Sequence, residues 1–290
     1  MKDLVKTLST FLLYIFLPTL ITYVLKTHFG ISSADNKIEF LIYANLALDV
    51  IFFVAFIIIN FDVLKKFQPF KGDTKTKKIM NYIITIIVLT ILLFVVKITS
   101  GIVCAIICGI FGLKQTSNNQ ELLELTFKSA PVLMTISGVI LAPVVEELVF
   151  RGAIRRVIKN KMVFVIVSGL LFGLVHVLKY DLPIFVILIL GIILNLILTS
   201  SLPKTKKVGL SICTTIVMMV VLCLSLHVIS GDFVNLIQNM SWSEAVNSLT
   251  YIAAGVLFAL VYVKYDNIYY SIGIHMMNNL ISYILLFTIG

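Results

Sequence analysis

The chain has 290 residues, of which 60% are hydrophobic and only 13% are charged, and its mean hydropathy is +1.08. This composition excludes a soluble globular protein and is typical of a helical protein that crosses a membrane several times. The net charge of +9 does not indicate nucleic-acid binding, because the basic residues lie in short loops between apolar segments.

The apolar segments, taken in chain order, predict an all-α polytopic membrane bundle of about eight or nine transmembrane helices. The third of these segments can continue past Lys97 to Ile110 as one long helix. The first is expected to remain in the protein, since no small-residue cleavage site follows it. The expected spans are residues 8–26, 39–61, 79–100, 130–158, 162–179, 183–201, 208–230, 247–263 and 268–289.

The charges of the loops predict the orientation of the bundle. Lysine and arginine residues follow the second, fourth, sixth and eighth expected spans, whereas the intervening loops are neutral or acidic. The positive-inside rule then places the N-terminus in the cytoplasm and the C-terminus outside. The composition, rich in Lys, Asn and Ile, suits a low-GC bacterium, so the expected location is a bacterial plasma membrane.

Two adjacent acids, Glu146 and Glu147, lie inside the fourth expected span. Ionisable side chains at membrane depth cost roughly 3 kcal/mol each on insertion scales and usually mark function. Glu147 and Arg151 are four residues apart with the acid first, which favours an ion pair within one helix. Because successive helical residues are rotated by about 100°, Glu146 and Glu147 are expected to point in different directions.

Two further spans carry polar residues with the spacing of one helix face. Phe172 and His176 are four residues apart in the fifth span, and His275 and Asn279 are four residues apart in the last span. Each pair therefore presents its two side chains to one side of its helix.

The depth of these residues in the membrane can be compared from the sequence. The chain is expected to turn near Lys161, and Glu146 precedes that residue by as many positions as His176 follows it. In an antiparallel hairpin both would lie about 20 Å of helix from the turn. Gly169 and Gly173 form a stripe of small residues that allows a neighbouring helix to approach closely. We therefore expect the Glu146 carboxylate to lie within reach of the His176 ring.

These residue types are suited to hydrolysis of an amide bond. A carboxylate and a neutral imidazole, here Glu146 and His176, can together orient and deprotonate a water molecule. A second imidazole and a side-chain amide, His275 and Asn279, can stabilise the oxyanion of a tetrahedral intermediate. No serine or cysteine lies at a matching depth with a helical partner, so a covalent nucleophile is not favoured.

A metal site is the competing chemical interpretation. Glu146, His176 and His275 have the ligand types for Zn²⁺ and would leave one position for water. The chain has no H-E-x-x-H motif, and Asn279 would be an unusual zinc ligand. No cofactor is therefore favoured, and zinc remains the alternative.

Three non-enzymatic interpretations are the alternatives to hydrolysis. A buried Glu–Arg pair or a single histidine in a membrane often serves packing alone, but three spaced pairs together argue against packing as the whole explanation. A non-catalytic scaffold or immunity protein would bind a partner through the same residues. A transporter would use them to relay protons, but no matching half of the chain, as in an inverted repeat, is evident.

The three motifs together resemble those of the CPBP family of intramembrane proteases, which includes type II CAAX prenyl endopeptidases, bacterial Abi-type proteins and proteins like lysostaphin resistance protein A. The family pattern EExxxR, FxxxH and HxxxN stands here complete, in order, as Glu146-Glu147-x-x-x-Arg151, Phe172-x-x-x-His176 and His275-x-x-x-Asn279. The resemblance divides the chain into N-terminal transmembrane helices, residues 1–128, and a protease core, residues 129–290. The distance from His176 to His275 exceeds the usual layout, which predicts an extra helical hairpin near residues 183–230.

The resemblance implies an intramembrane endopeptidase that cuts a membrane-embedded or membrane-associated peptide or protein. Glu146 with His176 would activate the water, and His275 with Asn279 would form the oxyanion site. Glu147, Arg151 and Phe172 would support the first helix or bind substrate. Bacterial relatives are linked to processing of peptide pheromones or bacteriocin precursors and to self-immunity.

Overall fold

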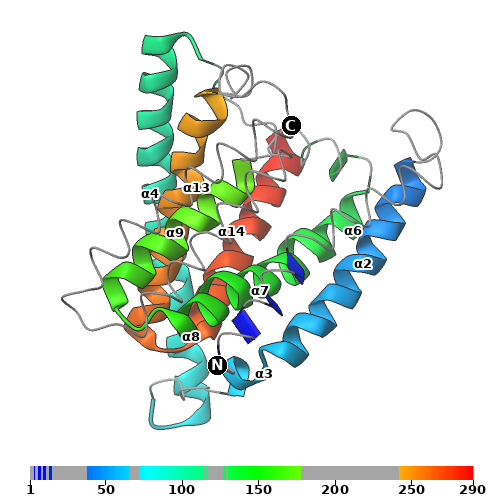
Figure 1. The fold of residues 1–290 in the computed structure, drawn as a ribbon, viewed down its shortest axis with the longest axis vertical. Coiled ribbons are helices and arrows are strands. Elements are labelled where there is room, and N and C mark those ends of the chain that lie inside the picture. The colour runs from blue at the N-terminus through cyan, green and yellow to red at the C-terminus, as the bar shows by residue number, and fades with distance from the viewer. Residues whose placement is uncertain are drawn as a thin grey trace, which may run out of the picture.

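The computed structural model describes most of the predicted protease core and part of the N-terminal region. Every regular element in the described residues is a helix (Figure 1). The described residues are 38–65, 72–113, 130–177 and 242–289, with the single positions Asp3, Lys6, Thr7, Ser9, Thr10, Leu13, Tyr14, Gln115, Glu124, Phe127 and Lys128. Several expected segments lie outside the described residues. They are the expected spans 183–201 and 208–230, the predicted hairpin near 183–230 and most of the expected span 8–26.

Four helices in the described part are long and apolar enough to cross a membrane, which makes the chain an integral membrane protein of the helical class. Two shorter apolar helices, Leu46–Ile59 and Lys161–His176, accompany them. The four candidate spans are Lys75–Phe111, Pro131–Val157, Val246–Tyr265 and Ile268–Thr288.

Helix α4 (Lys75–Phe111) confirms that the third apolar segment continues well past its expected end. Its 37 residues correspond to about 55 Å, which exceeds the roughly 30 Å hydrocarbon thickness of a bilayer. The Thr74 side chain accepts a hydrogen bond from the Lys77 backbone N–H at the start of the helix. The helix ends at Gly112, whose φ of 65° is in the left-handed region that glycine adopts at low cost.

The segment that carries the two adjacent acids is an irregular helix. It consists of α6 (Pro131–Thr135), the π-helical turn η1 (Ile136–Leu141), α7 (Ala142–Glu147), the π-helical turn η2 (Leu148–Ala153) and α8 (Ile154–Val157). Pro143 has no N–H, and in a regular α-helix its ring would collide with the carbonyl group of Val139. The widened turn of η1, which contains Val139, accommodates the proline without ending the helix.

Helix α9 (Lys161–Val177) follows after a tight connection, as the sequence predicts, and α13 (Trp242–Tyr265) packs along it. A Cβ atom placed on Gly169 would lie 2.9 Å from the backbone N of Val256, and one on Gly173 would lie 2.5 Å from that of Ile252. The stripe of small residues therefore serves close packing against α13. The expectation that this stripe brings the Glu146 helix close was wrong.

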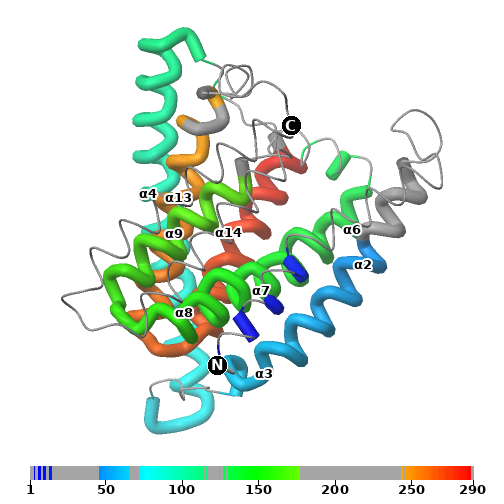
Figure 2. Tube along the Cα trace, viewed as in Figure 1, coloured from blue at the N-terminus to red at the C-terminus, as the bar shows by residue number. Residues whose placement is uncertain are grey.

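The remaining helices enclose the segment between α6 and α8. Helix α14 (Ile268–Ile289) begins directly after the Asp266–Asn267 turn, and both α13 and α14 contact α4. On the other side, α2 (Ile38–Ile59), which the short helix α3 (Phe61–Lys65) follows, lies beside α7 (Figure 2). The two adjacent acids thus lie between the α2 side and the α9–α13–α14 side of the bundle.

Candidate active site

Glu147 and Arg151 form an ion pair inside the bundle, as their spacing predicts. The Glu147 Oε1 to Arg151 Nη1 distance is 3.1 Å, and neither side chain has any exposed surface. Arg151 Nη2 also donates a hydrogen bond of 2.9 Å to the backbone carbonyl of Gly255 on α13. Its guanidinium carbon lies 4.7 Å from the centre of the Phe172 ring. The pair therefore links η2 to both α9 and α13.

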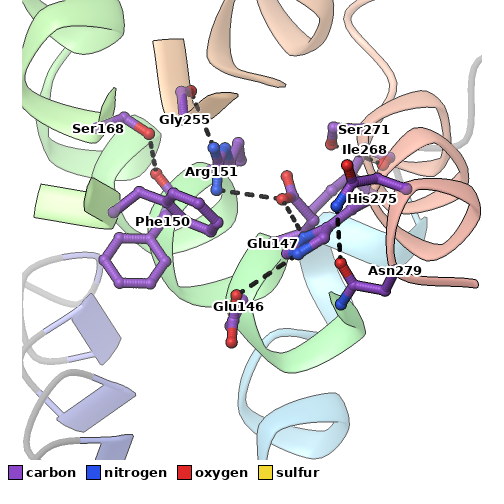
Figure 3. Close-up of polar contacts among 12 residues, drawn as sticks. Glu146, Glu147, Phe150, Arg151, Ser168, Gly255, Ile268, Ser271, His275 and Asn279 are labelled. Atoms are coloured by element: carbon purple, nitrogen blue, oxygen red, sulfur yellow. Dashed lines mark hydrogen bonds and ion pairs between the residues drawn. The ribbon is translucent and has the colours of Figure 1, made fainter. Parts of the chain in front are cut away.

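Glu147 makes a second contact that the sequence did not predict. Its Oε1 atom lies 3.0 Å from Nδ1 of His275, a ring that is almost fully buried (Figure 3). A carboxylate accepts hydrogen bonds, so this contact places a proton on Nδ1 and fixes the orientation of the ring. No signal in the sequence pairs the second acid with the last helix, because that pairing depends on how the two helices are rotated.

Glu146 faces both histidines of the motifs. Its Oε2 atom lies 3.6 Å from Nε2 of His176 and 3.7 Å from Nε2 of His275. These distances exceed the length of a direct hydrogen bond, and Oε2 is a buried oxygen with no hydrogen-bond partner among the residues that the structure describes. The helical rotation between the two acids thus brings Glu146 to one nitrogen of the His275 ring and Glu147 to the other (Figure 3).

The tautomer of His176 follows from its own helix. Its Nδ1 lies 2.7 Å from the backbone carbonyl oxygen of Phe172, which can only accept a hydrogen bond, so Nδ1 carries the proton. In the neutral ring Nε2 is then an acceptor that faces Glu146. The His176 ring also stacks on Tyr251 of α13, with ring centres 5.1 Å apart.

Most of the predicted site residues line one cavity of about 440 Å³ that lies between α4, α7, α9, α13 and α14. Of the predicted site residues, Glu146, Phe172, His176, His275 and Asn279 line it, whereas Glu147 and Arg151 are buried behind it. Asn279 Nδ2 donates a hydrogen bond of 2.7 Å to the carbonyl oxygen of Gly138. Lining residues that the sequence did not single out include Lys97, Tyr251, Asn278 and Tyr283.

Glu146 also borders a second, smaller cavity of about 190 Å³ on the α2 side. Apolar side chains such as Phe52 and Val145 dominate its walls, and Asp49 is its other acidic residue. Asp49 accepts a hydrogen bond from the Ser137 hydroxyl group. This explains how α2 accommodates an acid in its apolar sequence.

The fit of a metal ion can be judged from the donor groups. Histidine nitrogen and carboxylate oxygen atoms bind zinc at about 2.0–2.2 Å, usually in tetrahedral geometry. Among the described residues, no three or more His, Cys, Asp or Glu side chains are grouped so that they could hold a metal ion. The Glu146 carboxylate and the Nε2 atoms of His176 and His275 lie 3.6 and 3.7 Å apart, and zinc remains the alternative to a metal-free mechanism.

Comparison with known proteins agrees with the motifs. Residues 128–214 and 197–281 match the family described as type II CAAX prenyl endopeptidase Rce1-like, and together these stretches contain every predicted site residue. No curated protein and no solved structure matches the chain.

Proposed function

Because the chain belongs to the type II CAAX prenyl endopeptidase Rce1-like family, whose description implies a membrane protease, we propose that it hydrolyses a peptide bond of a membrane-associated peptide or protein. The observation that carries this proposal is the position of Glu146 Oε2, 3.6 and 3.7 Å from the Nε2 atoms of two histidines inside a cavity between apolar helices. A carboxylate so placed is suited to polarise a water molecule.

In the first step Glu146 and His176 deprotonate that water. The Phe172 carbonyl oxygen holds the His176 proton on Nδ1, so Nε2 and the Glu146 carboxylate are both acceptors directed at the same water. The water oxygen adds to the substrate carbonyl carbon, and its proton passes to Glu146. When the tetrahedral intermediate collapses, the C–N bond breaks and this proton is transferred to the leaving amine nitrogen.

His275 and Asn279 stabilise the negative charge that develops on the carbonyl oxygen. Glu147 holds the His275 proton on Nδ1, so Nε2 donates a hydrogen bond to the oxyanion only when the ring carries a second proton. The second N–H of the Asn279 amide, beyond the one bound to Gly138, is the other donor.

Glu147 and Arg151 act as positioning residues in this proposal. Arg151 holds Glu147 from one side, and Glu147 holds His275 from the other. Phe172 packs against both Arg151 and the His275 ring, whose centre is 5.5 Å away. Neither Glu147 nor Arg151 lines the cavity, so we expect neither to touch the substrate.

The proposed substrate is a membrane-embedded or membrane-associated peptide, such as a pheromone or bacteriocin precursor, in a bacterial plasma membrane. The enclosure of the site by apolar spans supports a substrate that reaches it from the lipid. The loop charges support a cytoplasmic N-terminus and an external C-terminus.

The test is cleavage of a library of membrane-spanning peptides by the purified protein in detergent. Glu146→Gln keeps the shape of the side chain but removes the base, so kcat/KM should fall by at least about a hundredfold. Asp73→Asn, at an exposed position before α4, is the matched control and should cleave as fast as the wild type. Equal cleavage by Glu146→Gln and wild type would contradict the proposal.

A chelator distinguishes the remaining alternatives. The proposed mechanism predicts that the wild type keeps its activity after treatment with a strong chelator. Loss of activity that added Zn²⁺ restores would instead support the zinc-dependent protease. Absence of any wild-type cleavage, together with an intact cellular phenotype in Glu146→Gln, would support a non-catalytic scaffold or immunity protein.

A further inference from the structure

Lys97 is a cation in the middle of the apolar helix α4 that lines the same cavity as the predicted catalytic residues. It lies outside both stretches that match the family. Its Nζ atom donates a hydrogen bond of 3.0 Å to Oδ1 of Asn278, a neutral amide on α14. A lysine at this depth is costly, so its position requires an explanation.

The Lys97 contact is the first of three hydrogen bonds in a row. Asn278 Nδ2 donates to Oδ1 of Asn279 over 2.9 Å. Asn279 Nδ2 in turn donates to the Gly138 carbonyl oxygen over 2.7 Å. This row of hydrogen bonds therefore runs from α4 through the two amides of α14 to η1. It includes Asn279, the proposed oxyanion donor.

The direction of all three hydrogen bonds follows from the chemistry of lysine. An ammonium group has donors and no acceptor, so Asn278 must present its oxygen to Lys97 and its NH₂ group to Asn279. Asn279 must then present its oxygen to Asn278 and its NH₂ group to Gly138 and the cavity. With the Asn279 amide turned by 180°, its oxygen would face the Gly138 carbonyl and the developing oxyanion, and both contacts would be repulsive. With the Asn278 amide turned, its NH₂ group would face the Lys97 ammonium and its oxygen would face the Asn279 oxygen.

We propose that Lys97 is a positioning residue that acts through Asn278 to hold the Asn279 amide with its N–H groups toward the oxyanion. This inference rests on the role proposed above for Asn279. Lys97 thus ties a helix outside the matched family stretches to the catalytic geometry.

A double-mutant cycle tests the inference. Wild type, Lys97→Met, Asn279→Ala and the double variant are compared in kcat and KM on the peptide that the wild type cleaves best. Lys97→Met should lower kcat by about ten- to a hundredfold, because a misplaced donor fits the transition state poorly, and should leave KM nearly unchanged. In the Asn279→Ala background, the same change should have no further effect on kcat, because the residue through which Lys97 acts is gone.

Two additional variants make the outcome specific. Asn278→Ala removes the middle residue of this row of hydrogen bonds and should reproduce the kcat loss of Lys97→Met. Lys77→Met, at an exposed position on the same helix, is the matched control and should match the wild type. The thermal midpoint of Lys97→Met should not fall, since methionine fills a similar volume without a buried charge.

The outcomes separate this inference from the proposed function. Unchanged kcat in Asn279→Ala would contradict the oxyanion role of that residue. Two results would overturn the positioning role alone. In the first, Asn279→Ala lowers kcat but Lys97→Met does not. In the second, both variants lower kcat and the two losses multiply in the double variant. A rise in KM confined to peptides with a carboxylate group would also overturn it, because Lys97 would then bind substrate directly.

Discussion

At the scale of single residues, Arg151 has the largest fully buried side chain in the described part of the protein. It is a full-sized cation with no exposed surface, and it contacts one carboxylate, one backbone carbonyl and the face of Phe172. A buried ion pair contributes little net stability compared with apolar residues, but removal of one partner leaves an uncompensated charge. The pair is therefore explained better by the geometry it imposes on His275 than by stability.

Arg151→Met should lower both the folded yield and the activity, because Glu147 loses its counter-charge in a place without water. The expected cost in the free energy of unfolding is about 3–5 kcal/mol, measured from detergent or denaturant titrations. Combining it with Glu147→Gln removes the isolated charge and should recover much of the yield without recovering the activity. Normal yield and normal cleavage in Arg151→Met would show that the pair has neither role.

At the scale of elements, the contact between α9 and α13 determines where His176 lies. Gly169 and Gly173 on α9 bring the two helix backbones together, and Gly255 on α13 meets Phe172 in the same contact. His176 is located less than one turn beyond Gly173 and stacks on Tyr251 of α13. The α9–α13 contact therefore holds the His176 ring against α13.

Gly173→Ala should destabilise the protein and reduce cleavage together. The added Cβ atom would lie 2.5 Å from the Ile252 backbone N, so α13 has to move, at a cost of about 1–3 kcal/mol. A lower thermal midpoint in detergent and a lower kcat are the expected results. Gly101→Ala on α4 is the matched control, since its Cβ atom would have no neighbour within 4 Å and should leave both quantities unchanged.

At the scale of the whole molecule, a polar cluster joins the N-terminal segment to the end of the irregular helix. Asp62 on α3 accepts hydrogen bonds from Arg156 on α8 at 2.8 Å and from Lys6 at 3.1 Å. Arg156 also donates to the Asn60 side chain at 2.7 Å. Partial burial disfavours the charged form of Asp62, but these hydrogen bonds outweigh it and lower the pKa of Asp62 below its ordinary value of 3.8.

The Asp62 cluster should make stability depend on pH in the acidic range. Because the pKa is lower in the folded state, the contribution is fully present above the unfolded pKa near 4 and is lost as pH falls through the folded pKa. Asp62→Asn should therefore lower the free energy of unfolding at pH 7 by no more than about 1 kcal/mol, since the carboxylate is partly exposed, and the thermal midpoint should fall with it. The difference from wild type should shrink at acidic pH, and a constant difference would refute the linkage.

Sequence and structure agree best for features that depend on a single helix and its ends. The length of the apolar segments predicts the extent of α14 and the long α4, and the loop between two of these segments predicts the turn before Lys161. Helical spacing predicts the Glu147–Arg151 pair. The equal depth of Glu146 and His176 followed from residue counting alone, and the structure brings their side chains to 3.6 Å.

The sequence by itself determined the class of protein, the helices in the described part of the core and the residues of the three motifs, because hydropathy and the helical period are properties of local sequence. Only the tertiary structure decided that Glu147 holds His275, that the α9 glycines face α13 and that Lys97 reaches the amides of α14. The helical period states which residues share a face, but it does not state which other helix that face meets. That choice depends on the rotation and packing of segments far apart in the chain.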